Sequence, residues 1–160
     1  MTPDTATRRP PVGEQARASG RPVVLATLGA PFDERAAAFA VDSAVESGSP
    51  LIVANVTALE PLTLSVRLGY DALEEFTPEV SDSVRRPVEL AHSLGVPVER
   101  LRIRSPRPIE ALLQLVAERR PGLLVFGPDR ARLKPRVYAR AVSAIRERAS
   151  CLVWVPGDAA

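Results

Sequence analysis

The residues that most suggest a chemical role lie in the stretch GLLVFGPDRARLKPRVYARAVSAI, residues 122–145. It begins with an apolar run that ends at Gly127, continues through a polar loop, and then follows a helical pattern. Nucleotide-binding loops with this outline use glycines, because a backbone without Cβ lets N–H groups approach phosphate closely. Here the loop carries arginines. The stretch therefore raises two alternatives, an anion site built from guanidinium groups or an ordinary solvated basic face.

The basic side chains of this loop and helix could act together on an anion. A helix N-terminus attracts anions through its dipole and free N–H groups, and guanidinium groups add charge-assisted hydrogen bonds. A phosphorylated metabolite, an acidic protein surface or RNA would suit such a site. Nucleic acid is disfavoured, because Tyr138 is the only aromatic residue in the cluster. The candidate anion-binding residues are Gly127, Arg130, Arg132, Lys134, Arg136 and Arg140.

Catalytic and metal chemistry have few candidate residues in this sequence. The chain contains one histidine, His92, and one cysteine, Cys151. No local spacing of carboxylates completes a Cys/His metal cage, and His92 lies near the end of a helical pattern, where surface or capping histidines are common. Cys151 begins an apolar strand with no activating residue adjacent in sequence, which favours a buried, unreactive thiol. We therefore expect no enzyme activity, no metal site and no cofactor.

Length and composition indicate one globular domain. The 160 residues are 46% hydrophobic and 25% charged, and the net charge of +2 is low for a dedicated nucleic-acid binder. A single cysteine fits a reducing compartment, so a cytoplasmic location is expected. The apolar runs are too short to span a bilayer, and the N-terminus has no hydrophobic signal segment. We expect a mobile tail at residues 1–20 and one domain at 21–157.

Alternating apolar runs and helical patterns predict the fold. Buried strands are expected at residues 21–29, 50–57, 123–127 and 151–157, and an edge strand with one exposed face at 96–105. Helices are expected at residues 31–48, 77–95 and 106–122 and after the loop at 128–134. This order predicts an α/β domain with a single open, mostly parallel five-stranded sheet and helices on both faces. Residues 58–76 form a long connection, either a lid over a ligand crevice or a cover on the sheet edge.

Local signals predict where the helices begin and end. Asp33 is expected to cap the first helix and Gly48 to end it, and Pro78 and Pro108 suit first-turn positions. Pro87 lies inside the second helical pattern, where it predicts a kink or a break. The expected apolar stripe of the first helix is Ala37, Phe39, Ala40, Ala44 and Val45.

Taken together, residues 21–157 resemble the universal stress protein (UspA-like) family. VVLATLG lies where that family has its first strand, LIVANV its second, PIEALLQLVAERRPGLLVFG its third helix and fourth strand, and ASCLVWVP its last strand. The resemblance rests on the order and spacing of these segments together with the closing strand. It implies an open five-stranded α/β sheet, a cytoplasmic setting, no known catalytic reaction, and a homodimer built largely on the last strand.

The resemblance also implies ATP binding in many members, and this sequence departs from that form. Nucleotide-binding members have an aspartate at the end of the first strand, where Leu28 stands, and G-x2-G-x9-G-[ST] after the fourth strand. Gly127 matches the first glycine, whereas Arg130 occupies the second. The G-[ST] pair falls within residues 139–141, and neither register restores it. Because an arginine side chain would block the phosphate pose, ATP binding is not expected.

The last strand is the expected dimer contact. In the family's strand order it lies at a sheet edge, where unpaired N–H and C=O groups favour pairing with another chain. A two-fold copy would satisfy those groups, and Trp154, which shares a strand face with Leu152, would lie in or beside the contact. The alternative is a strand covered by its own helices, with Trp154 as core. The predicted interface residues are Cys151, Leu152, Val153, Trp154 and Val155.

The sequence thus predicts a non-enzymatic, dimeric, universal-stress-protein-like regulatory or interaction module that has lost ATP binding. An unidentified protein partner is possible, and neither a membrane nor nucleic acid is expected as a partner. The alternative is a sensor that binds a nucleotide or another phosphorylated small molecule through the basic loop.

Overall fold

The computed structural model describes residues 20–59 and 78–157. The elements are β1 (Val23–Thr27), α2 (Glu34–Ser47), β2 (Leu51–Ala58), α4 (Pro78–Ser93), β3 (Val98–Ser105), α5 (Pro108–Arg119), β4 (Leu123–Phe126), the 3-10 turn η1 (Arg130–Arg132), α6 (Pro135–Arg148) and β5 (Leu152–Trp154). This alternation confirms the predicted α/β class. Nearly all of the predicted tail and connection lie outside the described residues.

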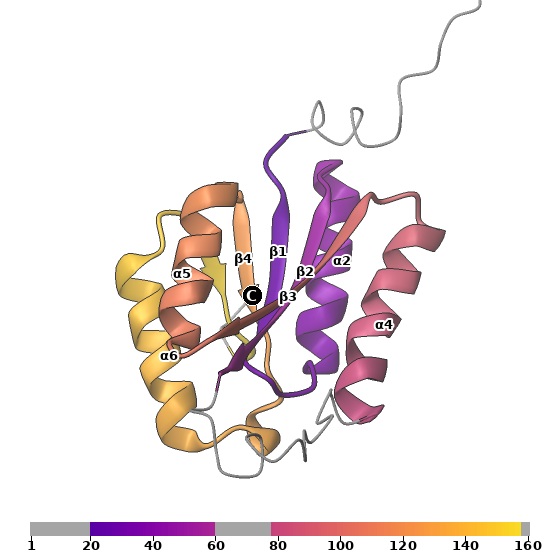
Figure 1. Cartoon of the computed structure of the whole chain (residues 1–160). Helices are drawn as coiled ribbons and strands as arrows, with labels where there is room; N and C mark the ends of the chain where they lie inside the picture. The colour runs from indigo at the N-terminus through magenta and orange to yellow at the C-terminus, as the bar shows by residue number, and fades with distance from the viewer. Residues whose placement is uncertain (1–19, 60–77, 158–160) are drawn as a thin grey trace, which may run out of the picture.

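The five strands form one sheet in the order β3-β2-β1-β4-β5, and all four neighbouring pairs are parallel. The predicted edge position of β3 is therefore confirmed, and β5 lies at the other edge. The helix that follows β1 and the helix that follows β4 cover opposite faces of the sheet (Figure 1). Open α/β sheets place ligands at such a switch point, beyond the C-terminal ends of the two strands.

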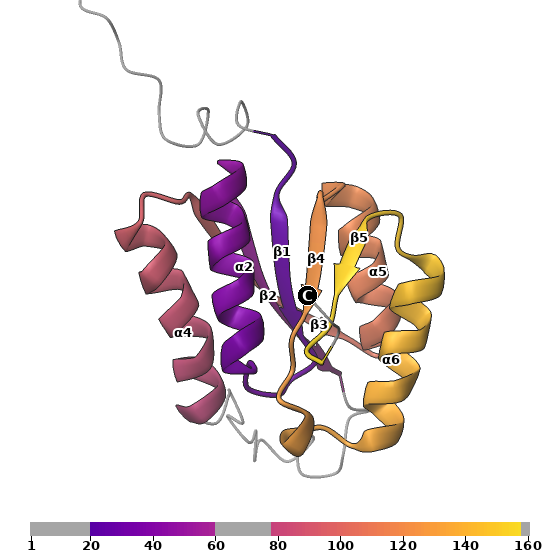
Figure 2. The ribbon, with the colours of Figure 1, turned by 180° about the vertical axis from the view of Figure 1, so that it is seen from behind.

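Helices cover both faces of the sheet, as predicted. Figure 1 and, from behind, Figure 2 show α2 and α4 on one face and α5 and α6 on the other. Each face has its own cluster of buried side chains, because residues of a strand alternate between the two faces. Phe126, at the end of β4, is fully buried between β4 and α6 and belongs to the α5/α6 cluster.

The predicted ends of α2 are confirmed, because they depend on local hydrogen bonds. The Asp33 carboxylate accepts hydrogen bonds from two N–H groups of the first turn, and Gly48 ends the helix in the left-handed conformation with φ 64°. Part of the predicted apolar stripe is wrong. Val45 is 43% exposed, whereas Ala36 and Val41 are buried. The helix face that touches the sheet is centred on alanines, which permit a close approach, and this turns Val45 toward solvent.

Pro87 does not break α4, which runs from Pro78 to Ser93 as one helix. A proline removes one intrahelical hydrogen bond, but burial of one helix face against the sheet can outweigh that loss. Val84, Val88 and Ala91 provide this buried face. The predicted break at Pro87 is therefore wrong.

Candidate functional site

The loops after β1 and β4 meet at the switch point of the sheet. The Asp33 N–H donates a hydrogen bond to the Gly127 carbonyl at 2.9 Å. The Asp129 N–H donates to the Pro31 carbonyl at 2.8 Å. Phe32 lies between these two bonds and is only 6% exposed. Four backbone groups at this crevice are therefore bonded to one another.

Gly127 is required by packing between α2 and β4. A Cβ added to Gly127 would overlap the Cβ of Ala36, which lies in the first turn of α2. Real side chains do not approach so closely, so any other residue would force α2 away from the sheet. The glycine that matches the first position of the nucleotide motif thus has a structural role here.

The turn that follows β1 satisfies its own polar groups. The Thr27 hydroxyl donates to the Ala30 carbonyl at 2.8 Å, and Gly29 adopts a φ of 71°. Leu28 is 9% exposed and belongs to the buried cluster beneath α5 and α6. A buried leucine side chain accepts no hydrogen bond. The position where the nucleotide-binding form has an aspartate therefore belongs to the core.

Two carboxylates already accept hydrogen bonds from backbone N–H groups near the switch point. Asp33 accepts hydrogen bonds from the N–H groups of Arg35 at 2.9 Å and Ala36 at 3.1 Å. Asp129 accepts one from the N–H of Ala131 at 3.0 Å. A phosphate at either position would have to displace a carboxylate of like charge.

The predicted anion-binding arginines of the loop after β4 point to different places. The Arg130 guanidinium lies over the Tyr138 ring, 4.6 Å from its centroid. Arg132 instead lines a groove beside α2 and α4. Tyr138 is 8% exposed and its ring packs against Phe126 at a centroid distance of 6.1 Å. It is therefore a core residue and offers no open surface for stacking a base.

The other three basic candidates lie at the start of α6. Lys134 is the N-cap residue of α6, and Arg136 and Arg140 lie in its first two turns with exposed side chains. Within the described part of the chain, the cap makes no side-chain hydrogen bond and the first turn holds no acidic residue. The structure therefore divides the predicted site into a packed Arg130, a separate Arg132, and a basic helix end at α6.

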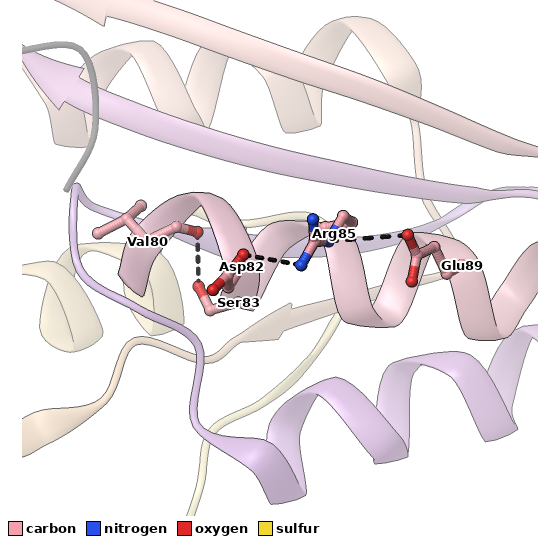
Figure 3. Close-up of polar contacts among 5 residues, drawn as sticks. All are labelled: Val80, Asp82, Ser83, Arg85 and Glu89. Atoms are coloured by element: carbon pink, nitrogen blue, oxygen red, sulfur yellow. Dashed lines mark hydrogen bonds and ion pairs between the residues drawn. The ribbon is translucent and has the colours of Figure 1, made fainter. Parts of the chain in front are cut away.

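A groove of about 760 Å³ lies between α2 and α4, beside the switch point. Glu34 of α2 and Arg86 of α4 approach across it, with 3.8 Å between a carboxylate oxygen and a guanidinium nitrogen. On the exposed side of α4, Arg85 pairs with Asp82 at 2.9 Å and with Glu89 at 3.7 Å (Figure 3). Such exposed pairs contribute little to stability.

Ser83 links α4 to the loop after β1. Its hydroxyl donates to the Val80 carbonyl at 2.9 Å (Figure 3) and accepts from the Phe32 N–H at 3.2 Å. The hydroxyl therefore holds the first turns of α4 against the same loop that closes the switch point.

The five predicted interface residues divide between the two faces of the sheet. Those that pack toward α5 and α6 are Cys151, Val153 and Val155. Trp154 packs toward α2, where its ring stacks on Phe39 at a centroid distance of 4.4 Å. Leu152 is 75% exposed, the highest value among the large hydrophobic side chains of the described residues. Leu152 is thus the apolar side chain available at this edge, and Trp154 is partly engaged within its own chain.

Cys151 is partly buried, and burial raises the pKa of its thiol. A raised pKa lowers the thiolate fraction, so the cysteine is a weak nucleophile. His92 is exposed in the last turn of α4. Residues 20–59 and 78–157 contain no group of three or more potential metal-binding side chains. Within the same ranges, no helix is both long and apolar enough to cross a membrane.

These features can be compared with known proteins. The model of the universal stress protein family matches residues 20–155, which is most of the chain. The protein therefore belongs to the universal stress protein family. A search of curated proteins found no match to this sequence.

Solved structures of the family share this fold. UspA from Lactobacillus plantarum is 16% identical, with a TM-score of 0.62 and coverage of 85% of this chain and 98% of that chain. A universal stress protein from Archaeoglobus fulgidus in complex with dAMP is 20% identical, with a TM-score of 0.57 and coverage of 86% and 98%. A universal stress protein in complex with cAMP is 20% identical, with a TM-score of 0.60 and coverage of 88% and 99%.

Proposed function

We propose that this protein is a non-enzymatic, cytoplasmic universal stress protein that acts as a regulatory or interaction module and does not bind ATP in the manner of its nucleotide-binding relatives. The observation that carries the proposal is the pairing of the loops after β1 and β4, in which Asp33 bonds to Gly127 and Asp129 bonds to Pro31. A nucleotide at the switch point would need these backbone groups for itself.

The residues around this pairing support the same proposal. Leu28 places a buried hydrocarbon where nucleotide-binding members have a carboxylate. Arg130 replaces the second glycine of their motif, and its guanidinium is stacked on Tyr138. The carboxylate of Asp129 takes an N–H of the same loop. Each feature either removes a contact that the nucleotide would need or places a blocking or negatively charged group where its triphosphate would lie.

A homodimer formed through β5 is part of the proposal. In the described residues β5 pairs with β4 on one side, and its other side is the edge of the sheet. Leu152 exposes most of its side chain there. A two-fold copy would pair the backbone groups of the edge and cover this leucine.

The alternative function is a sensor for a phosphorylated small molecule at the N-terminus of α6. The observation that favours it is the basic, uncapped start of that helix, formed by Lys134, Arg136 and Arg140. This version needs no contact at the crevice between β1 and β4. Arg130 and Arg132, which the structure directs elsewhere, would contribute little to it.

Calorimetric titration of the full chain with ATP, AMP and cAMP tests the main proposal. We expect no heat of binding with any of the three at millimolar nucleotide. A micromolar dissociation constant with adenine specificity would overturn it. If inorganic pyrophosphate raises the melting temperature and Arg136→Ala with Arg140→Ala removes that effect, while Arg132→Ala does not, the sensor version is supported.

A further inference from the structure

A cavity of about 270 Å³ lies beneath α4, against β2 and β3. It is called the α4 pocket here and is lined by Asn55, Ser81, Val84, Arg100, Leu101 and Arg102. Strand alternation brings its polar side chains together. Asn55 shares a strand face with Val53, and Arg100 and Arg102 share one with Val98; both valines pack in the α2/α4 cluster. In the sheet register Asn55 is paired with Arg102, and Val53 with Arg100.

Among the residues that line the α4 pocket, Asn55 gives the most specific indication of a ligand. The residue is 3% exposed, and its Oδ1 accepts a hydrogen bond from the Gly29 N–H at 2.9 Å. This bond fixes the orientation of the amide, because only the oxygen can accept. Its Nδ2 is buried and has no hydrogen-bond partner among the described residues. Native proteins rarely leave such a donor unpaired, so an acceptor at this position is expected.

The other polar groups of the α4 pocket are also donors. Arg100 and Arg102 bring guanidinium groups, Ser81 brings a hydroxyl, and the described lining holds no carboxylate. The neighbouring Glu99 is held by Arg119 through two bonds of 2.8 Å. A set of hydrogen-bond donors that includes guanidinium groups matches an occupant that only accepts hydrogen bonds and carries negative charge.

We propose that the α4 pocket binds a small molecule that bears a carboxylate or phosphate group. Asn55 Nδ2 and the Ser81 hydroxyl donate to its oxygens, Arg100 and Arg102 balance its charge, and the side chain of Val84 forms an apolar wall. The volume lies just below the roughly 300 Å³ at the lower end of ligand sites, which suits a metabolite smaller than a nucleotide. The site is separate from the crevice between β1 and β4 and does not depend on whether ATP binds there.

The side-chain amide of Asn55 provides a direct readout. In a ¹⁵N-labelled full-length protein its NH₂ signals are assigned by their loss in Asn55→Asp, and the wild type is then titrated with inorganic phosphate and with succinate. Sodium chloride at equal ionic strength is the reference. We expect a saturable shift of the Asn55 signals with at least one of the two anions. A response to phosphate alone identifies a phosphate-bearing ligand, and a response to succinate alone identifies a carboxylate-bearing one.

Two further variants distinguish anion binding in the α4 pocket from nonspecific attraction to the positive charge of β3. Arg100→Ala should weaken anion binding about tenfold or more, because it removes a charge-assisted contact. Arg104→Ala is the matched control, since Arg104 lies on the same face of the same strand but does not line the pocket. Asn55→Asp keeps the acceptor for Gly29 and replaces the donor with a negative charge, so it should abolish the anion-induced shifts of the backbone amides around the pocket.

The proposal is overturned if neither anion gives a saturable shift of the Asn55 signals, as expected where only water occupies the pocket. Equal anion affinity in Arg100→Ala and Arg104→Ala would also overturn it. Arg100 is exposed, so its substitution leaves the fold intact and this comparison remains decisive if Asn55→Asp does not fold.

Discussion

The two edges of the sheet differ in length, charge and exposure. β3 has eight residues, carries the exposed Arg100, Arg102 and Arg104, and is tied to α5 by the ion pair between Glu99 and Arg119. β5 has three residues, all apolar, and exposes Leu152. Charge on an edge strand opposes pairing with another chain, and an uncharged edge permits it. If the proposed homodimer forms, this difference favours β5 over β3 as the edge that pairs.

The largest expected effect is on the association of β5. Leu152→Lys places a charge at the proposed two-fold contact, so a wild-type dimer should become a monomer because the ammonium groups would be buried or repel each other. Light scattering behind size exclusion should give twice the chain mass for the wild type and the chain mass for the variant.

Leu94→Lys is the control for that experiment, because Leu94 is also an exposed leucine, at 52%, but lies after α4. It should remain a dimer. A wild-type monomer at high micromolar concentration would refute association through β5.

The next effect is on stability and concerns the inner side of the same edge. Trp154→Ala removes the stack on Phe39. Replacing a fully buried aromatic residue with alanine lowers the free energy of unfolding by about 3–5 kcal/mol. Because Trp154 is partly exposed, we expect a loss of about 2–3 kcal/mol. Urea denaturation followed by circular dichroism measures it, since the variant has no tryptophan fluorescence.

The experiment on Trp154 is done in the Leu152→Lys background, so that dissociation does not contribute to the measured stability. Trp154→Phe should retain most of the stability, because a ring still faces Phe39. A loss below about 0.5 kcal/mol in Trp154→Ala would show that the stack does not anchor β5.

A smaller effect is expected at β3. Arg104→Val removes one charge from this edge and increases its β-propensity, so a fraction of the protein should form species larger than a dimer at high concentration. Sedimentation velocity detects such species. Arg104→Lys keeps the charge and should behave as the wild type. If the valine variant also remains purely dimeric, charge at this position does not protect the edge.

The smallest effect concerns the ion pair on the β5 side of the molecule. The hydrogen bond from Arg148 holds the pKa of Glu110 below its ordinary value of 4.5, and the pair joins α5 to α6. A carboxylate with a depressed pKa stabilises the fold above the unfolded-state value, and this contribution is lost as the pH falls through the folded-state value.

Glu110→Gln should therefore melt slightly below the wild type at neutral pH, and the two curves should converge as the solution is acidified below 4.5. Thermal unfolding across that range measures the difference, and Arg148→Gln should show the same convergence. Parallel curves at every pH would mean that the pair adds nothing to stability, as many exposed pairs do.

Much of the fold could be predicted because its signals are local. Asp33 and Gly48 mark helix ends through hydrogen bonds within a few residues, and the alternation in β3 identifies an edge strand. The incorrect predictions concern positions whose burial or conformation is determined by tertiary packing. Val45 fits a helical stripe but lies outside the face that touches the sheet, and α4 continues through Pro87 because one face of the helix is buried against the sheet.

The candidate sites were less predictable, because they depend on the directions in which side chains point and on the register between neighbouring strands. Arg130 and Arg132 are neighbours in sequence, yet one stacks on Tyr138 and the other lines the groove beside α2 and α4. Asn55 and Arg102 are distant in sequence and become neighbours only when β2 pairs with β3. A polar residue inside the apolar run LIVANV was the one local signal for the α4 pocket, and it says nothing about its partners.

Gly127 has a consequence for how members of this family are sorted by sequence. Since the Cβ of Ala36 leaves no room for a side chain, selection would retain glycine here in a lineage that binds no nucleotide. A sequence score that counts every glycine of the motif would then treat a glycine that is required for packing against α2 as evidence for nucleotide binding. The position of Arg130 carries no such packing demand, because its side chain is exposed. The second glycine is therefore the more informative marker when related sequences are classified.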